Sequence, residues 1–195
     1  KIGLNFATSL RSILRQDPDV LLIGEIRDEE TANIAVKFSM TGHLVFSTVH
    51  ANDATSTILR LLDLGIPPFL LGSSLNLIMA QRLVRTIDQD YKETYKPSKD
   101  ELDLIKFPKS KIKSTKFYRG IPHRSNHNSG YKGRTSIHEI LEVDNTIKKI
   151  ILNGSDQIEI KKNAIKNGMT PLRDAGIEKI ISGTTSIEEV KRATV

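Results

Sequence analysis

The sequence predicts an α/β fold built on a parallel sheet. Two short apolar runs, residues 20–23 and 44–49, each end abruptly in polar or ionisable residues, Gly24-Glu25 after the first run and His50 after the second. Such runs are typical of buried parallel strands that end at the edge of a sheet. The segment between them has the pattern of a helix, and a strand, a helix and a strand in this order form a right-handed crossover.

Local signals place the first elements along the chain. A helical stripe precedes the first strand, and Asp17-Pro18 ends that helix. Residues 29–40 read as the crossover helix, because two acids stand in its first turn and Thr41-Gly42 follows its last. The residues of the first stripe are Phe6, Leu10, Ile13 and Leu14.

Two further helices are expected before the pattern changes. The first covers residues 54–64 and ends at Gly65. Pro67-Pro68 opens the second, which we expect to reach about residue 84. The α/β part then ends near Ile87.

The remaining chain divides into two parts. Residues 88–130 have few aliphatic side chains, clustered charge and several prolines, so we expect an inserted, loop-rich subdomain of low regular content. Residues 131–195 are expected to be mostly helical. Their helix signals are the capping-box spacings Asp156/Glu159 and Ser186/Glu189, the pair Thr170-Pro171, and the stops Gly154, Gly168 and Gly183. The expected domains are therefore residues 1–87, 88–130 and 131–195.

Composition narrows the class of protein. A chain of 195 residues with 38% apolar content can bury the core of one or two domains. The absence of Cys excludes a disulfide framework and a thiolate zinc site, which fits a reducing compartment. The longest apolar stretch, residues 69–80, is interrupted and too short for a membrane span, and no signal peptide is expected.

Positive charge is concentrated in one segment. The net charge is +6, and residues 106–134 hold nine basic residues and no acid. A concentrated basic segment indicates an anionic partner, which is a nucleic acid, an acidic protein or an anionic lipid. The alternative is a solvated lysine-rich loop. The nine residues are Lys106, Lys109, Lys111, Lys113, Lys116, Arg119, Arg124, Lys132 and Arg134.

Five stretches, in the same order, resemble the hexameric ATPases of type II secretion systems and type IV pilus assembly. They cover residues 10–28, 41–53, 81–86, 130–141 and 169–194, nearly the whole chain. The resemblance implies a RecA-like P-loop NTPase core. No Gly-x-x-x-x-Gly-Lys-[Ser/Thr] motif occurs here, since none of the 12 glycines precedes a lysine. The chain therefore resembles the second half of the family's motor domain, which follows the phosphate-binding loop.

The resemblance implies that Ile23-Gly24-Glu25 is the Walker B segment, with Glu25 near Mg²⁺ and the attacking water. A carboxylate is a hard oxygen ligand that suits this ion, although Glu25 could instead cap the following helix. His43 and His50 resemble the family's histidine box, which would sense the γ-phosphate or link nucleotide state to the neighbouring subunit; a structural role is the alternative.

Three arginines are further candidates. Arg27, Arg60 and Arg82 could bind phosphate or pair between subunits, because the guanidinium forms a bidentate fork with phosphate or carboxylate. Surface ion pairing is the alternative for each. Many family members bind one zinc through two CxxC pairs in the region matching residues 88–128; here only His123 and His127 stand at metal-compatible spacing, so no zinc site is expected.

We therefore expect an ATP- and Mg²⁺-dependent motor that assembles a pilus or pseudopilus, with the chain alone inactive. The resemblance implies a homo-hexamer in the cytoplasm, peripheral to the bacterial inner membrane. Its expected partners are the membrane platform protein and membrane-anchored secretion components, with anionic lipid as a further candidate. The alternative is a non-catalytic module that binds nucleic acid or a partner through the basic segment. Few aromatic residues interleave that segment, so nucleic acid is not expected.

Overall fold

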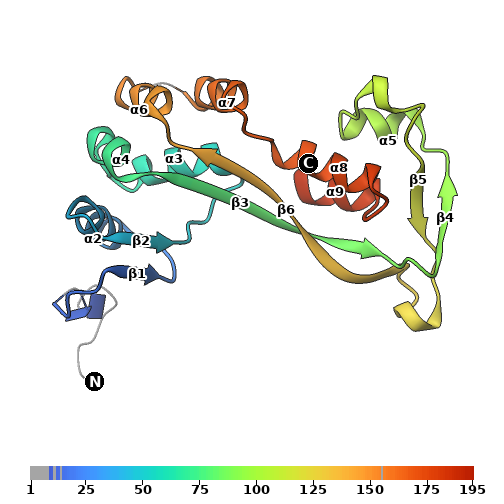
Figure 1. Cartoon of the computed structure of the whole chain (residues 1–195), viewed down its shortest axis with the longest axis horizontal. Helices are drawn as coiled ribbons and strands as arrows, with labels where there is room; N and C mark the ends of the chain where they lie inside the picture. Colours follow the sequence, from blue (N-terminus) through green and yellow to red (C-terminus); the bar gives the residue numbers. More distant parts are fainter. Residues whose placement is uncertain (1–8, 11, 14, 155) are drawn as a thin grey trace. The chain divides into compact units, whose positions relative to one another are not determined.

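The computed structural model describes residues 9–10, 12–13, 15–154 and 156–195 (Figure 1). Of the expected first helix, Phe6 and Leu14 lie outside the described residues, and residues 9–10 and 12–13 are helical. The chain then forms β1 (Val20–Ile23), α2 (Glu29–Met40), β2 (Leu44–Ser47), α3 (Ala54–Asp63), α4 (Pro68–Ser74), β3 (Leu77–Ile87), β4 (Lys92–Tyr95), α5 (Lys99–Leu104), η1 (Lys109–Lys111), β5 (Phe117–Gly120), η2 (Arg124–Asn126), β6 (Tyr131–Glu142), α6 (Asn145–Leu152), α7 (Gln157–Lys166), α8 (Leu172–Ile181) and α9 (Ile187–Thr194).

The described chain packs into two compact units. Unit 1 comprises residues up to 78 together with 140–169, and unit 2 comprises residues 79–139 and 170–195. These units do not coincide with the ranges 1–87, 88–130 and 131–195, because β3 and β6 each supply residues to both units. No helix in the described part of the chain is long and apolar enough to cross a membrane.

Unit 1 contains the predicted strand–helix–strand crossover. β1 and β2 pair in parallel, with Val20 opposite Leu44 and Ile23 opposite Ser47, and α2 connects them. The Asp28 carboxylate begins α2 by accepting a hydrogen bond of 2.8 Å from the Thr31 backbone N–H. After the helix, Gly42 takes a φ of 96°, a left-handed conformation that favours glycine. The expected parallel arrangement is confirmed.

Asp53 fixes the start of α3 and ties it to α7. Its Oδ1 accepts a hydrogen bond of 2.8 Å from the Ser56 backbone N–H, and its Oδ2 lies 2.9 Å from Lys161 Nζ. Burial raises the pKa of the Asp53 carboxyl, but the Lys161 ammonium and the Ser56 hydrogen bonds outweigh burial and lower the pKa to about 2. The carboxylate is therefore charged at neutral pH and connects two helices that are far apart in the sequence.

Replacing Asp53 by alanine is expected to lower the free energy of unfolding by about 2 kcal/mol, because the substitution removes a helix cap and the partner of Lys161. Asp53→Asn keeps a capping oxygen and loses only the ion pair, so it should cost about half as much. Urea unfolding followed by circular dichroism measures both. Exposed Asp63 at the end of α3 provides the control, Asp63→Ala. A wild-type midpoint for Asp53→Ala would show that the cap contributes nothing.

The prediction of one helix from residue 67 to about 84 is wrong. α4 ends at Ser74, and residues 77–87 form the long strand β3. Exposed and buried side chains alternate at the start of this strand, where Leu77 is exposed and Ile78 is buried. β3 pairs with β6, and the arrows of the two strands run in opposite directions (Figure 1). This partner lies far along the chain, so tertiary pairing overrides the local helical pattern.

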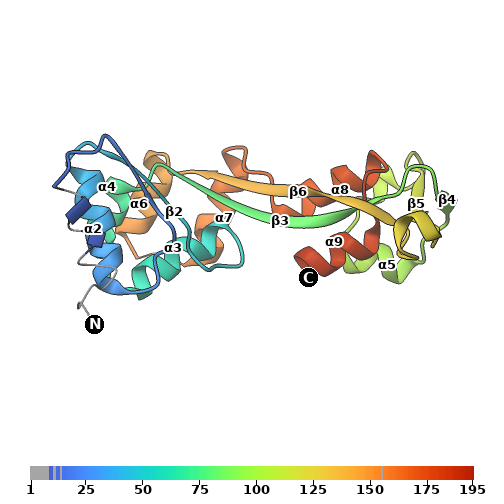
Figure 2. The ribbon, with the colours of Figure 1, turned by 90° about the horizontal axis from the view of Figure 1, so that it is seen from below.

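Unit 2 contains more regular structure than residues 88–130 led us to expect. β4 and β5 pair antiparallel, with Lys92 opposite Gly120 and Tyr95 opposite Phe117, and α5 lies between them in the chain. Figure 2 shows α8 and α9 alongside the same unit. The inserted elements and these helices share one core, whose residues are Leu102, Ile105, Phe107, Phe117, Ile177, Ile180, Ile187 and Val190.

The C-terminal helices are confirmed, although they divide between the units. α6 and α7 belong to unit 1, and α8 and α9 belong to unit 2. Asp156 and Ser186 cap α7 and α9 through their side chains. Thr170-Pro171 does not act as the expected cap and first helical residue: α8 starts at Leu172, whose backbone N–H donates to Glu139 Oε2 at 3.1 Å. The buried Glu139 carboxylate replaces a local cap.

Candidate active site

The segments that follow β1 and β2 are joined by backbone hydrogen bonds. The Ile26 backbone N–H donates to the Thr48 carbonyl oxygen at 2.9 Å. The Thr48 hydroxyl donates to the Gly24 carbonyl oxygen at 2.7 Å. Because the strands are parallel, both segments leave the same edge of the sheet, which is where open α/β sheets hold their ligands. These bonds bring the residues after each strand together.

Glu25 is the centre of this cluster. Its Oε2 accepts a hydrogen bond of 2.6 Å from Arg27 Nε, and Arg27 Nη2 is also 2.6 Å from it. Its Oε1 lies 2.5 Å from Nε2 of His50. The Glu25 side chain is 20% exposed, whereas those of His50 and Arg27 are 86% and 74% exposed. A recessed carboxylate is thus covered by two groups that reach into solvent.

Oε1 of Glu25 is the atom best suited to a further ligand. It is buried, and within the described residues no group donates an aligned hydrogen bond to it. The close approach of His50 Nε2 is therefore an electrostatic contact rather than an aligned hydrogen bond. A carboxylate oxygen in this position fits direct or water-mediated binding of a hard cation such as Mg²⁺.

His43 lies at the other end of β2. It directly precedes the strand, whereas His50 follows it, and an extended strand advances about 3.3 Å per residue. The His43 ring stacks on Phe38 with a centroid separation of 4.0 Å, and its Nδ1 is 2.9 Å from the Thr41 hydroxyl. The structure therefore separates His43 from Glu25.

The other two candidate arginines also lie outside the cluster. Arg60 is exposed on α3, and its side chain forms no ion pair with any described residue. Arg82 is on β3 in unit 2, where its Nη1 donates to the Gln81 carbonyl oxygen at 3.3 Å. Of the predicted site residues, the structure brings together Glu25, Arg27 and His50.

The histidines of the inserted region make local contacts. The ring of His123 stacks on Tyr91 with a centroid separation of 3.7 Å, and its Nδ1 is 2.8 Å from the Ser125 hydroxyl. His127 occupies a left-handed turn at the end of η2. A search of the described residues finds no group of three or more His, Cys, Asp or Glu side chains that could hold a metal. The absence of a zinc site stays a prediction.

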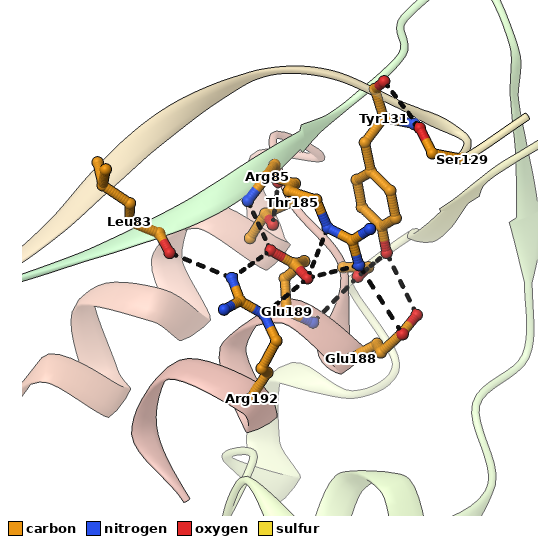
Figure 3. Close-up of polar contacts among 9 residues, drawn as sticks. Leu83, Arg85, Ser129, Tyr131, Thr185, Glu188, Glu189 and Arg192 are labelled. Carbon is orange, nitrogen blue, oxygen red and sulfur yellow. Dashed lines mark hydrogen bonds and ion pairs between the residues drawn. The ribbon is translucent and has the colours of Figure 1, made fainter. Parts of the chain in front are cut away.

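Sequence reasoning missed a buried carboxylate in unit 2. The Glu189 side chain is inaccessible to solvent and lies between two arginines (Figure 3). Its Oε1 accepts from Arg85 Nε at 2.9 Å, and its Oε2 accepts from the Arg85 backbone N–H at 2.6 Å and from Arg192 Nη2 at 2.8 Å. The Arg85 guanidinium also lies 4.1 Å from the centre of the Tyr131 ring.

The only signal for Glu189 in the sequence is its capping-box spacing from Ser186, which predicts a helix start and not a buried ion pair. Burial raises the pKa of the Glu189 carboxyl, but the hydrogen bonds from Arg192 and Arg85 outweigh burial and lower the pKa to about 2. Glu189 is therefore an anion that links β3 to α9. It stabilises unit 2 and is not part of the Glu25 cluster.

Comparisons with known proteins place the chain in a family. A family model described as "Type II/IV secretion system protein" matches residues 1–192. The type IV pilus assembly ATPase PilB of Myxococcus xanthus is 48% identical over 193 residues, which are 97% of this chain and 34% of that protein. The type II secretion system ATPase E of Vibrio cholerae is 47% identical over 196 residues, which are 100% of this chain and 38% of that protein.

A solved structure extends the comparison to the fold. The pilus retraction motor PilT with bound ADP matches with a TM-score of 0.67 at 25% identity, over 97% of this chain and 43% of that chain. The α/β, RecA-like fold is thus confirmed. The chain spans 34% and 38% of the lengths of the two curated relatives. The matched family model covers nearly every residue, and the chain therefore belongs to the type II/IV secretion system protein family.

Proposed function

We propose that this chain is the second half of an ATP-hydrolysing motor that powers pilus or pseudopilus assembly and protein secretion at the bacterial inner membrane. One observation carries the proposal: Glu25 and His50 meet beyond the carboxyl ends of two parallel strands, with a carboxylate oxygen left without an aligned donor among the described residues. In a chain of this family, that arrangement suits phosphoryl transfer to water.

Each residue of the cluster has a proposed role. A nucleotide with its Mg²⁺, when bound, would supply the γ-phosphoryl group and the positive charge that offsets it. Glu25 would orient the attacking water and hold the cation directly or through water. His50 would respond to the γ-phosphate, since its exposed ring can leave Glu25 without breaking the core. Arg27 would pair with phosphate through its planar fork.

The three remaining candidate residues are proposed to contact neighbouring subunits. His43, at the far end of β2, would transmit nucleotide state to a neighbouring subunit. Exposed Arg60, and Arg82 in unit 2, would bind phosphate or carboxylate across a subunit interface of a homo-hexamer. None of these three residues is proposed to act on the water.

The basic segment supports a membrane-proximal location in the cytoplasm. All nine of its basic side chains are exposed, and Arg119 pairs with Glu93 at 2.7 Å. We propose that it faces the inner-membrane platform protein or other membrane-anchored secretion components. Anionic lipid is a secondary candidate, because basic clusters near a membrane gain about 1 kcal/mol per residue from acidic lipids.

The proposal is tested by comparing residues 1–195 with the complete protein. The complete protein is expected to hydrolyse ATP in the presence of Mg²⁺, and residues 1–195 alone are expected to show negligible turnover. The reason is that the sequence contains no Gly-x-x-x-x-Gly-Lys-[Ser/Thr] cradle for the β- and γ-phosphates. Phosphate release measures both. Absence of hydrolysis by the complete protein would contradict the proposed function. Turnover by residues 1–195 alone would contradict the claim that the phosphate-binding loop lies outside this sequence.

A further inference from the structure

A groove in unit 2 lies outside the Glu25 cluster. It has a volume of about 720 Å³ and lies beside the β4–β5 pair and α5. Figure 1 shows these elements next to one another. The groove is bordered by residues 94–97 on one side and by residues 112–113 and 115–118 on the other, with Lys99 and Leu102 of α5 completing it.

The floor of the groove is apolar. Leu102 and Phe117 are buried members of the unit 2 core, and Tyr95 and Ile112 are half-buried against that core. The floor is therefore held rigidly by the packed core rather than by a loose loop. A concave apolar floor offers contact area to a side chain that enters it.

The rim of the groove is positively charged. Lys96, Lys99, Lys113 and Lys116 are exposed, and none of the four ammonium groups forms an ion pair or hydrogen bond with a described residue. Among the described residues, no Asp or Glu lines the groove. Glu101 of α5 contacts one residue of the lining, because its carboxylate lies 3.5 Å from the Tyr95 hydroxyl. The same carboxylate accepts a hydrogen bond of 2.7 Å from the Ser98 backbone N–H. The rim charge is thus left for a partner.

We propose that this groove binds an acidic amphipathic peptide segment of a partner protein. An apolar side chain of the segment rests on Tyr95 and Ile112, and its carboxylates face the four lysines. An exposed lysine–carboxylate pair contributes little to affinity, so apolar contact supplies the affinity and charge selects the partner. Binding therefore weakens as salt rises.

The shape of the groove favours a peptide over a lipid surface. Proteins that lie on a bilayer insert apolar side chains that project outward. The large apolar side chains that line this groove are buried or half-buried, so none projects. The inference rests on the proposed partner-facing role of the basic segment, to which Lys113 and Lys116 belong, and not on the nucleotide chemistry. Peptide binding and ATP turnover are measured separately, so either can fail alone.

The experiment selects short random peptides from a display library on residues 1–195 and measures the affinity of the best peptide by fluorescence anisotropy. We expect acidic peptides with at least one large apolar residue. The double variant Lys113→Glu/Lys116→Glu is expected to weaken binding at least about tenfold, and Ile112→Ala by a similar factor. The control Lys162→Glu/Lys166→Glu, which makes the same charge change on exposed positions of α7, should bind like wild type.

Three outcomes would overturn the inference. Selected peptides that lack acidic residues would contradict the charge argument. Equal loss of affinity in the groove variant and in the α7 control would show that peptide binding depends on net charge and not on the groove. Phosphatidylglycerol vesicles that bind residues 1–195 through these lysines, with peptides unaffected by the groove substitutions, would assign the rim to a lipid surface instead.

Discussion

Replacing Glu25 by glutamine in the complete protein is expected to lower ATP turnover by about 100-fold or more while nucleotide binding is retained. The amide keeps the shape of the side chain and loses the negative charge that orients water and holds a cation. The substitution also removes the ion pair with Arg27 and alters the contact with His50, and both of these residues are exposed. Phosphate release at saturating ATP gives the turnover, and a fluorescent nucleotide analogue gives the affinity.

A neighbouring substitution separates this effect from a general change of charge. Glu30 lies in the first turn of α2 and is exposed, so Glu30→Gln should hydrolyse ATP like the wild type. His50→Ala should reduce turnover less than Glu25→Gln, since it leaves the carboxylate in place. Wild-type turnover in Glu25→Gln would show that Glu25 takes no part in hydrolysis. An equal loss of turnover in Glu30→Gln would show that the effect comes from the change in net charge.

Replacing Glu189 by alanine is expected to lower the free energy of unfolding by about 3 kcal/mol, because it leaves two arginines and the part-buried Arg85 backbone N–H without their common partner. The adjacent Glu188 is a matched control. Its side chain is 76% exposed and lies 3.9 Å from Arg85, so Glu188→Ala should change the free energy of unfolding by less than about 0.5 kcal/mol. Urea unfolding measures both variants, and hydrogen exchange assigns the loss to unit 2.

The pH dependence of unfolding provides a second test of Glu189. Its pKa is about 2 in the folded protein, below the ordinary value of 4.5. The unfolded chain therefore binds the proton first as the pH falls, so the stabilisation is complete above pH 4.5 and is lost as the pH falls toward 2. Glu189→Ala should lose less stability than the wild type over that window. Parallel curves for the two proteins would show that Glu189 contributes no charge-dependent stability.

Local signals made β1, α2 and β2 predictable. The cap at Asp28, the stop at Gly42 and the apolar runs act within a few residues, and parallel strands must end at one edge of the sheet. The same geometry predicts that Glu25 lies near His50. The family resemblance groups His43 with His50, whereas the structure puts His43 at the opposite end of the same strand.

The missed features depend on residues that are distant in sequence. β3 is a strand because β6 pairs with it, and its own residues also fit a helical pattern. Arg85 and Glu189 are separated by 104 positions, so no window of sequence contains both. Of the groove rim, Lys113 and Lys116 belong to the basic segment identified from the sequence, whereas Lys96 and Lys99 do not. The apolar floor beneath them forms only when α5 and β5 pack on the C-terminal helices.

The two units have a consequence for the order in which the protein folds during synthesis. Each unit is discontinuous, since the chain passes between them at residues 78–79, 139–140 and 169–170. The ion pair of Asp53 cannot form until the ribosome has added Lys161, 108 residues later. In the same way, Arg85 cannot pair until Glu189 has been added. Domains usually fold as units from the N-terminus as they emerge. Each unit is therefore complete only after most of the chain has left the ribosome, because unit 1 needs residues 140–169 and unit 2 needs residues 170–195.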